Sequence, residues 1–252
     1  MNQPLISIIM PAYNCERFIE IAIRSVIQQT YHNWELLVID DASTDATFEI
    51  VCRMMEGEPR IRGIQNPTNM GVARTRNRGL DLAQGEYVAF LDSDDSWHTD
   101  KLTEQLRCME NAGASLCFTS YAIIDEQGVF FRSYLVPGSI CFEDLLKENV
   151  IGCSTVLLSR EITEKYRFAT DFYHEDYCLW LDILKDGYCA IGCAKVLVDW
   201  RFVAKSRSFN KKRSARKRWR IYRKHLHLSF FKSAKVFAAY AFRGWKKYYG
   251  KH

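Results

Sequence analysis

The sequence has 252 residues, of which 48% are hydrophobic and 26% charged, a composition typical of a globular protein with one large or two small domains. No stretch approaches the about 20 apolar residues of a membrane-spanning helix, and the N-terminus lacks the basic and apolar segments of a secretory signal. The nine cysteines are scattered without a paired CxxC motif, so we expect reduced thiols rather than disulfides or a zinc site.

Charge is distributed unevenly along the chain. Residues 201–252 contain 18 of the 35 lysines and arginines and no acidic residue. Residues 1–200 contain the other 17 basic residues and all 30 acidic ones, which gives a formal charge of −13. The net charge of +5 therefore describes neither part. We expect an acidic globular domain over residues 1–204 and a basic helical tail over residues 205–252.

The first half alternates short apolar runs with amphipathic stretches. Strands are predicted over residues 5–10, 35–39, 61–65 and 87–91. Helices are predicted over residues 16–29, from Ser43 or Thr44 to about residue 55, and over residues 72–83. Pro11 is expected to end the first strand. This alternation predicts an α/β fold with a mainly parallel central sheet flanked by helices.

The second half is less regular. Helices are predicted around residues 102–109 and over residues 176–185. Strands are predicted over residues 115–120, 153–158 and 196–202, and a hairpin turn is predicted at residues 125–128.

Polar side chains follow three of the predicted strands, at residues 11–14, 40–41 and 92–95. Ligands of parallel sheets bind beyond the carboxyl ends of the strands, so we expect one crevice at these positions. Asp92, Asp94 and Asp95 place three carboxylates within four positions. Such a cluster suits Mg²⁺ or Mn²⁺, but a solvated acidic turn that caps the next helix is an equal alternative on these residues alone. Neither a GxGxxG motif after the first strand nor a GxxxxGK[ST] motif is present.

Six segments, taken in order, resemble the motifs of family 2 glycosyltransferases. They are SIIMPAYN at residues 7–14, IDDASTD at 39–45, NMG at 69–71 with RN at 76–77, GEY at 85–87, FLDSDDSW at 90–97 and HEDYCLW at 174–180. The resemblance covers about residues 5–205 and implies a GT-A fold that transfers a sugar from a nucleoside diphosphate donor with inversion. It implies a nucleotide-binding half over about residues 1–112 and an acceptor-binding half over about residues 113–204. Thr75 stands where many members have alanine.

The resemblance also implies roles for the residues at the strand ends. The motif residues Pro11, Ala12, Tyr13 and Asn14 would bind the nucleotide, with Tyr13 stacked on the base. Asp41 would accept a hydrogen bond from the uracil imide. The structural alternatives are that Tyr13 packs on the first helix and that Asp41 caps a helix.

The acidic turn has implied roles as well. Asp92 would reach the ribose or a metal-bound water, Ser93 would lie beside the nucleotide, and Asp94 would bind a Mn²⁺ or Mg²⁺ ion that bridges the diphosphate. Arg76 would lie near the nucleotide, with a surface charge on a helix as its alternative.

The remaining implied roles concern the acceptor. A bound cation neutralises the charge on the leaving diphosphate, while the acceptor hydroxyl needs a general base. Asp176 is the candidate base and Glu175 its orienter or a second acceptor contact. The alternative for Asp176 is an acid favoured by the dipole of a helix N-terminus. His174 is interpreted as a loop residue or, alternatively, a metal ligand.

The basic tail interleaves aromatic side chains with cations. Its apolar positions are spaced by three, four or seven residues and comprise Trp219, Tyr222, Leu226, Phe230, Phe237, Ala241, Trp245 and Tyr248. Its cationic positions comprise Arg216, Lys217, Arg220, Arg223, Lys224, Lys232, Lys235 and Lys246. A helix on an anionic membrane surface and a helix packed back on the globular domain both fit this pattern. Nucleic-acid binding comes third, because no nucleic-acid module is recognisable.

These features together predict a metal-dependent glycosyltransferase. It would use a UDP-sugar and a lipid-linked saccharide acceptor at the cytoplasmic face of a membrane, in bacterial surface-polysaccharide assembly. The QxxRW signature of processive members is absent, so we expect the addition of one sugar. A nucleotidyltransferase and a non-catalytic sugar-nucleotide or membrane-surface binding protein are the alternatives. The former lacks its triphosphate loop here, and the latter would not need Asp94 and Asp176 together.

Overall fold

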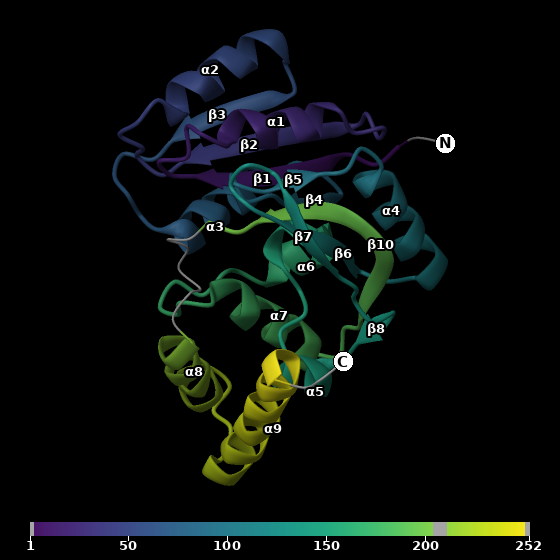
Figure 1. The fold of residues 1–252 in the computed structure, drawn as a ribbon. Helices are drawn as coiled ribbons and strands as arrows, with labels where there is room; N and C mark the ends of the chain where they lie inside the picture. Colours follow the sequence, from purple (N-terminus) through teal and green to yellow (C-terminus); the bar gives the residue numbers. More distant parts are fainter. Residues whose placement is uncertain (1–2, 204–210, 250–252) are drawn as a thin grey trace.

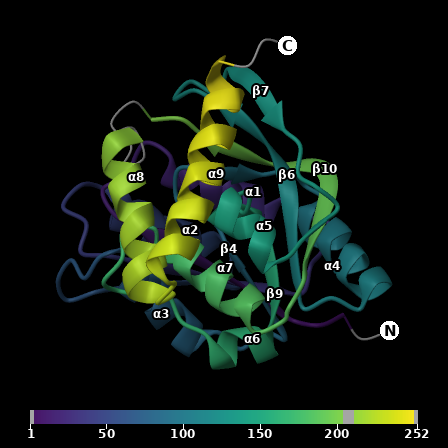
Figure 2. The same ribbon diagram turned by 90° about the horizontal axis from the view of Figure 1, so that it is seen from below.

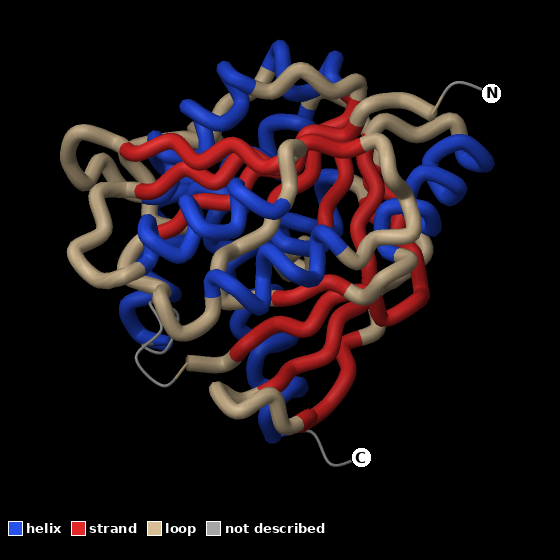
Figure 3. The backbone as a smooth tube through the Cα atoms, turned by 90° about the horizontal axis from the view of Figure 1, so that it is seen from above, coloured by secondary structure: helices blue, strands red, loops and turns tan. Residues whose placement is uncertain are grey.

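The computed structural model describes residues 3–203 and 211–249, with the side chains of residues 211–214 and 244–249 left undescribed. The described strands form one sheet in the order β3-β2-β1-β4-β9-β6-β10-β5, and two further strands, β7 and β8, pair with β6 and β10 (Figure 1). Figure 3 shows this sheet, with its strands coloured red, and the helices that flank it, coloured blue.

The N-terminal half of the sheet is parallel. Its strands are β1 (Ile6–Ala12), β2 (Trp34–Asp40), β3 (Ile61–Gln65) and β4 (Tyr87–Phe90). The connecting helices are α1 (Ile19–Ile27), α2 (Thr47–Gly57) and α3 (Val72–Leu82). Every residue of β1 and β2 is buried, which explains why both strands are mostly apolar.

The second half extends the same sheet with mixed strand directions. Its elements are β5 (Ser96–Trp97), α4 (Lys101–Ala112), β6 (Leu116–Ile124), β7 (Phe130–Tyr134), β8 (Ser139–Ile140), α5 (Phe142–Lys147), η1 (Cys153–Thr155), β9 (Val156–Ser159), α6 (Arg160–Lys165), α7 (Glu175–Lys185) and β10 (Ala190–Arg201). Strand β9 runs antiparallel to both β4 and β6, whereas β6 and β10 are parallel. The sheet is therefore mixed and mostly parallel, as the α/β pattern predicts.

Two apolar clusters cover the two faces of the sheet. Ile8 and Leu36 face the cluster that contains α1 and α4, whereas Ile9 and Leu37 face the cluster that contains α3 and α7. Successive residues of a strand point to opposite faces, so each buried strand contributes to both clusters. All nine cysteines are free thiols in the structure.

Several predicted boundaries are wrong. Strand β1 continues through Pro11, because its pairing with β4 ends at Ile9 and a proline there gives up no bond to β4. Helix α2 begins at Thr47 rather than at residue 43 or 44, because the Ser43 hydroxyl donates to Asp40 within the preceding loop. Strand β6 is longer at its end than predicted and β10 longer at its start, and the predicted strand at residue 153 begins as the turn η1.

The tail forms α8 (Lys211–Arg220), the π-helical segment η2 (Ile221–His225) and α9 (Phe230–Tyr249). These elements lie beside α5 and α7 (Figure 2). Tyr222, Leu226 and Val236 are buried in the same cluster as α7, and the Tyr222 hydroxyl donates to the Leu146 carbonyl at 2.6 Å. The predicted alternative of a helix packed back on the globular domain is thus confirmed for these residues.

The cations of the tail are mostly exposed. Those with exposed side chains are Arg216, Arg220, Arg223, Lys224, Lys232, Lys235 and Arg243. Lys217 is partly buried. Arg218 is buried, and its guanidinium lies 4.2 Å from the ring centre of Tyr177 and 4.3 Å from that of Tyr240. The predicted apolar positions Trp245 and Tyr248 and the cation Lys246 lie outside the described side chains. No helix within the described residues is long and apolar enough to cross a bilayer.

Candidate active site

The carboxyl ends of β1, β2 and β4 meet at one edge of the sheet, as predicted. Pro11 and Ala12 are the buried end of β1, and the Tyr13 side chain that follows is 49% exposed. Asn14 joins two of the loops, because its backbone N–H donates to the Ser43 hydroxyl at 2.9 Å and its side-chain oxygen accepts from the Thr44 N–H at 2.8 Å. The exposed ring of Tyr13 therefore stands on a fixed loop and is accessible to a ligand.

Asp41 anchors the loop that leads into α3. Its buried carboxylate accepts hydrogen bonds from the Asn66 side chain at 2.7 Å and from the N–H groups of Met70 and Gly71 at 2.8 Å each. The expected alternative of a helix cap does not hold for α2, which begins at residue 47 and receives no bond from Asp41. The bond to Gly71, in contrast, lies at the N-cap position of α3. A carboxylate accepts about four hydrogen bonds, so Asp41 keeps acceptor capacity for a ligand.

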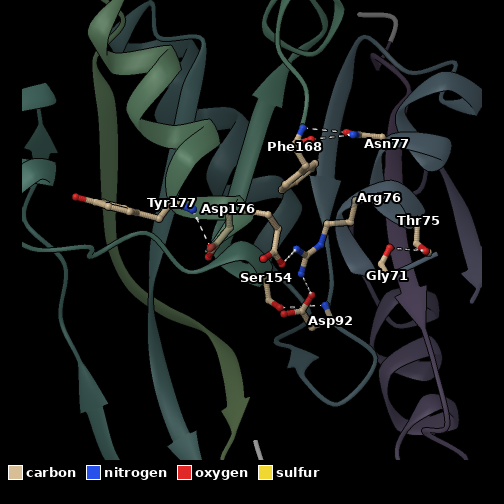
Figure 4. Close-up of polar contacts among 10 residues, drawn as sticks. Gly71, Thr75, Arg76, Asn77, Asp92, Ser154, Phe168, Asp176 and Tyr177 are labelled. Carbon is tan, nitrogen blue, oxygen red and sulfur yellow. Dashed lines mark hydrogen bonds and ion pairs between the residues drawn. The ribbon is translucent and has the colours of Figure 1, made fainter. Parts of the chain in front are cut away.

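Thr75 departs from the family pattern without leaving a buried hydroxyl unpaired. Its Oγ1 donates to the Gly71 carbonyl at 3.1 Å (Figure 4) and accepts from the Asn66 side chain at 3.1 Å. The hydroxyl therefore reinforces the same loop that Asp41 holds.

The acidic turn divides its three carboxylates between two roles. Asp95 is buried and accepts from the Ser154 hydroxyl at 2.5 Å and from the Arg201 N–H at 2.9 Å. The Ser154 oxygen in turn accepts from the Asp92 N–H at 3.0 Å. Burial and the charge of Asp94 raise the pKa of Asp95 well above its usual range. Asp95 is thus a structural residue, and Asp92 and Asp94 are left partly exposed.

Asp92 and Asp94 fit a divalent cation that is shared with a phosphate ligand. Burial and the charge of Asp92 raise the pKa of Asp94 to about 6, and a bound cation would reverse that effect. Magnesium-type sites use one or two carboxylates plus substrate phosphates. Within the described residues no group of three or more carboxylates, thiols or imidazoles is placed to hold a metal, so His174 does not complete such a group.

Ser93, between these two acids, lies against the Cys15 thiol and connects the turn to the loop after β1. The turn is also supported from α4 and η1. The Trp97 indole N–H donates to the Ser154 carbonyl at 2.9 Å, and the Gln105 amide donates to the Thr155 carbonyl at 2.9 Å.

Arg76 connects the acidic turn to the start of α7. Its guanidinium is 3% exposed and donates to Asp92 at 2.6 Å and to Glu175 at 2.9 Å. Figure 4 shows Arg76 pointing at Asp92. The alternative of a surface charge on a helix is therefore wrong. Asn77, the next residue, donates to and accepts from the Phe168 backbone at 2.9 Å, which holds the Phe168 ring 5.2 Å from the Arg76 guanidinium.

The two acids at the start of α7 have different environments. Glu175 is 4% exposed and its carboxylate is engaged by Arg76. Asp176 is partly exposed and accepts from the Tyr177 N–H at 2.7 Å (Figure 4). Burial and the charge of Glu175 raise the pKa of Asp176 to about 6, so this carboxyl group is ionised near neutral pH and is a competent base.

A cavity of about 280 Å³ opens between these groups. Its lining comprises Arg76, Asp92, Asp95, Tyr121, residues 149–155, residues 173–176, Val198 and Trp200. The structure therefore brings Arg76, Asp92, Glu175 and Asp176 to one cavity, whereas Tyr13, Asp41 and Asp94 do not line it. Sequence reasoning missed Ser154 and Trp200, which come from predicted strands, and Tyr121, which follows a predicted strand and lies in the observed β6.

Residues 7–168 match the model of the family described as glycosyl transferase family 2. The chain belongs to this family. It is 38% identical over 246 residues to TuaG of Bacillus subtilis, a glycosyltransferase provisionally assigned to teichuronic acid biosynthesis, with 97% of this chain and 98% of TuaG covered. It is 40% identical over 223 residues to WfgD of Escherichia coli, with 88% and 86% covered. WfgD is named a UDP-Glc:α-D-GlcNAc-diphosphoundecaprenol β-1,3-glucosyltransferase.

Solved structures match the fold at low identity. TarS of S. aureus in complex with UDP-GlcNAc superposes with a TM-score of 0.75 at 18% identity, over 96% of this chain and 72% of TarS. The mannosyltransferase PcManGT of Pyrobaculum calidifontis, in complex with GDP-Man and Mn²⁺, gives 0.70 at 19% identity, over 100% of this chain and 77% of PcManGT. The GT-A fold and the glycosyltransferase class expected from the sequence are thus confirmed.

Proposed function

We propose that this chain is an inverting transferase that moves one sugar from a UDP-sugar to a hydroxyl of a lipid-linked saccharide, in bacterial surface-polysaccharide synthesis. The observation that carries the proposal is the shared cavity: Asp92, from the acidic turn, and Asp176, a carboxylate with its pKa raised to about 6, line the same space. A donor phosphate and an acceptor hydroxyl could thus meet there.

Donor binding falls to the strand-end residues. Pro11, Ala12 and Tyr13 would form the floor under the base, with the exposed Tyr13 ring stacked on it, and Asn14 would also bind the nucleotide. Asp41 would accept from the uracil imide with the capacity that its three loop hydrogen bonds leave.

The acidic turn would bind the rest of the donor. Asp92 and Ser93 would contact the ribose side, and Asp92 and Asp94 would hold Mn²⁺ or Mg²⁺. When bound, the cation would neutralise charge on the diphosphate leaving group. The buried Arg76 pairs with Asp92 at 2.6 Å and holds that side chain in place.

Acceptor activation would fall to Asp176. The carboxylate takes the proton of the acceptor hydroxyl as that oxygen attacks the anomeric carbon, and the bond from that carbon to the diphosphate breaks. Glu175 would act as a positioning residue, since Arg76 occupies its carboxylate and links it to Asp92. Attack on the face opposite the leaving group inverts the anomeric configuration.

The acceptor class is supported by relatives. WfgD, 40% identical over 223 residues, is named for a diphosphoundecaprenol-linked acceptor. Residues 1–204 would form the catalytic domain, with a nucleotide-binding half over about residues 1–112 and an acceptor-binding half over about residues 113–204. The basic tail, residues 205–252, would associate with the anionic inner face of the cytoplasmic membrane through its exposed cations.

A thermal-shift screen with UDP-, GDP- and CMP-sugars, with and without Mn²⁺, tests the proposal. A ligand that binds the native state alone raises the apparent melting temperature. We expect a Mn²⁺-dependent rise with one UDP-sugar, and a smaller rise for Tyr13→Ala. Ile21→Ala, which alters a side chain of similar exposure (47% against 49%), should respond as the unmodified protein. The absence of a rise with any sugar nucleotide would contradict the donor site.

A further inference from the structure

Large apolar side chains are exposed mainly on two segments of the described chain. One is the hairpin around β7, where Val129 is 59%, Phe130 58%, Phe131 60% and Leu135 70% exposed. The other is α9, which presents the exposed Phe230, Phe231 and Phe242. Exposed apolar side chains gathered on neighbouring elements mark an interaction surface.

The hairpin shows an unusual exposure pattern. Consecutive residues of a strand point to opposite faces, yet Phe130 and Phe131 are both more than half exposed. Among the described strands β7 pairs with β6 alone, so it is an edge strand. Edge strands of soluble proteins are ordinarily protected by charged side chains or by covering elements. Two exposed phenylalanines at such an edge therefore need a partner that accepts aromatic surface.

Fixed contacts hold the hairpin in this position. The Asp125 side chain accepts from the N–H groups of Gln127 and Val129 at 2.9 and 2.8 Å, which closes the turn. Arg201 donates to the Asp125 carbonyl at 3.0 Å, and Arg17 pairs with Glu126 at 2.9 Å. These contacts fix the turn before β7 and therefore the position of the exposed phenylalanines that follow it.

The hairpin and α9 meet at one acidic side chain. The Tyr134 hydroxyl of β7 donates to Glu148 at 3.2 Å, and Arg243 of α9 lies 3.8 Å from the other oxygen of Glu148. Figure 2 accordingly shows the C-terminal part of α9 beside β7. Phe242, one position before Arg243, therefore lies at the hairpin end of α9.

The outer face of α9 continues the apolar edge. Exposed residues recur at the helical spacing of four, three and four, at Phe231, Lys235, Ala238 and Phe242. The opposite face contains the buried Val236 and packs on the globular domain. We name the hairpin residues 129–135 and this outer stripe of α9 the aromatic rim.

The charges of the rim identify its partner. Arg132 on β7 and Lys235 and Arg243 on α9 are exposed. No acidic residue occurs in residues 201–252, and the nearby Glu148 already faces Arg243. Aromatic side chains combined with cations match an anionic lipid surface, where rings enter the headgroup boundary and cations meet phosphates.

The rim also borders the cavity. Tyr134 of the hairpin stacks on Tyr121, with ring centres 5.2 Å apart and planes inclined by 23°, and Tyr121 lines the cavity. We infer that the hairpin and the outer stripe of α9 form one surface that docks this chain on an anionic bilayer, with the cavity next to the lipid. The role of the cavity as acceptor site rests on the proposed function, whereas docking of the rim does not.

Co-sedimentation with vesicles tests the inference. The unmodified protein should bind vesicles of phosphatidylcholine mixed with phosphatidylglycerol, and bind phosphatidylcholine alone weakly. Phe130→Ser combined with Phe131→Ser should weaken binding to the mixed vesicles by at least about tenfold, because two rings no longer enter the lipid. Ile21→Ser removes an exposed apolar side chain from α1, far from the rim in sequence, and should bind as the unmodified protein.

Two controls separate this inference from the proposed function. The double variant should keep its melting temperature, its donor-induced thermal shift and its transfer to a detergent-solubilised acceptor. Unchanged vesicle binding by the double variant would overturn the inference, whatever the enzyme does. The inference would also be overturned if the unmodified protein is a dimer in solution and the double variant is a monomer. The rim would then be an interface between two copies of the chain.

Discussion

Arg76 is the residue on which the two acidic motifs converge. It is almost fully buried, and its guanidinium donates to Asp92 at 2.6 Å and to Glu175 at 2.9 Å. Glu175 is equally buried, so neither charge has water as an alternative partner. Replacing one partner of this ion pair should therefore lower the stability of the fold strongly, because the other charge would remain uncompensated in the interior.

Arg76→Gln should accordingly lower the free energy of unfolding by about 3–5 kcal/mol, the usual cost of a buried ion pair with one partner removed. It should also abolish transfer, because Asp92 loses its partner. Urea denaturation of the variant measures the first effect. Arg74→Gln, on the exposed side of the same helix, is the control and should leave stability within about 0.5 kcal/mol. Equal stability of the two variants would contradict the coupling.

The pH dependence follows from Asp176. Its pKa is raised to about 6, so the base is ionised above that pH and protonated below it. At saturating donor, acceptor and metal, kcat should be constant near pH 8 and fall about tenfold for each pH unit below 6. A pH–rate profile measures this, and a kcat that is unchanged between pH 7 and pH 5 would exclude Asp176 as the base.

Sequence reasoning reached part of this site. Asp41, Asp92 and Asp94 could be placed because the carboxyl ends of parallel strands share one edge of the sheet. Ser154 and Arg201 could not, because they meet the acidic turn from η1 and β10, more than 50 residues away in sequence. Their contacts depend on the order of strands in the sheet, which no local pattern encodes.

At the level of elements, β10 depends on a glycine. The backbone of Gly192 comes so near Pro137 that an added Cβ would lie 1.9 Å from the Pro137 carbonyl oxygen. The strand carries Trp200 and Arg201 to the cavity and the acidic turn, so its position bears on the site. A side chain at 192 would displace either the strand or the segment before β8.

Gly192→Ala should therefore lower the free energy of unfolding by about 1–3 kcal/mol, as overpacking does in well-packed regions. Gly138→Ala is the matched control, because an added Cβ there has no neighbour within 4 Å. Denaturant unfolding of both variants provides the measurement. A stability for Gly192→Ala that equals the control would show that the backbone relaxes at no cost.

The elements predicted best were those with one clear hydrophobic periodicity or with a residue that plainly begins or ends the element. The strand Ile61–Gln65 was predicted at its observed ends, and α3 within one residue, between the turn at Gly71 and the end at Leu82. The start of α2 was wrong because Ser43, a good capping residue, bonds to Asp40 instead. Long-range pairing also lengthened β6 and β10 beyond their local apolar runs.

For the whole molecule, the tail is part of the folded structure. Tyr222 is fully buried and donates to Leu146 of α5 at 2.6 Å. His225 lies 2.9 Å from Asp182 of α7. Deleting the tail would expose this surface of the globular domain, so a truncation cannot by itself separate membrane binding from stability.

Tyr222→Ala should thus destabilise the whole protein by about 3–5 kcal/mol, the range for large aromatic residues in a core. The control is Phe231→Ala, because the Phe231 side chain is 83% exposed. This variant should change the free energy of unfolding by less than about 0.5 kcal/mol. Thermal and urea unfolding of the two variants distinguish a packed tail from an appended one. Equal stability would contradict the packing of η2 on α5.

The central claim is that Asp176 activates the acceptor while the strand-end residues bind the donor. The most direct test compares Asp176→Asn with Asp171→Asn, an exposed aspartate in the preceding loop, for donor binding by thermal shift and for sugar transfer to a lipid-linked acceptor. We predict that both variants bind the donor as the unmodified protein does and that Asp176→Asn alone loses transfer. Undiminished transfer by Asp176→Asn would contradict the account.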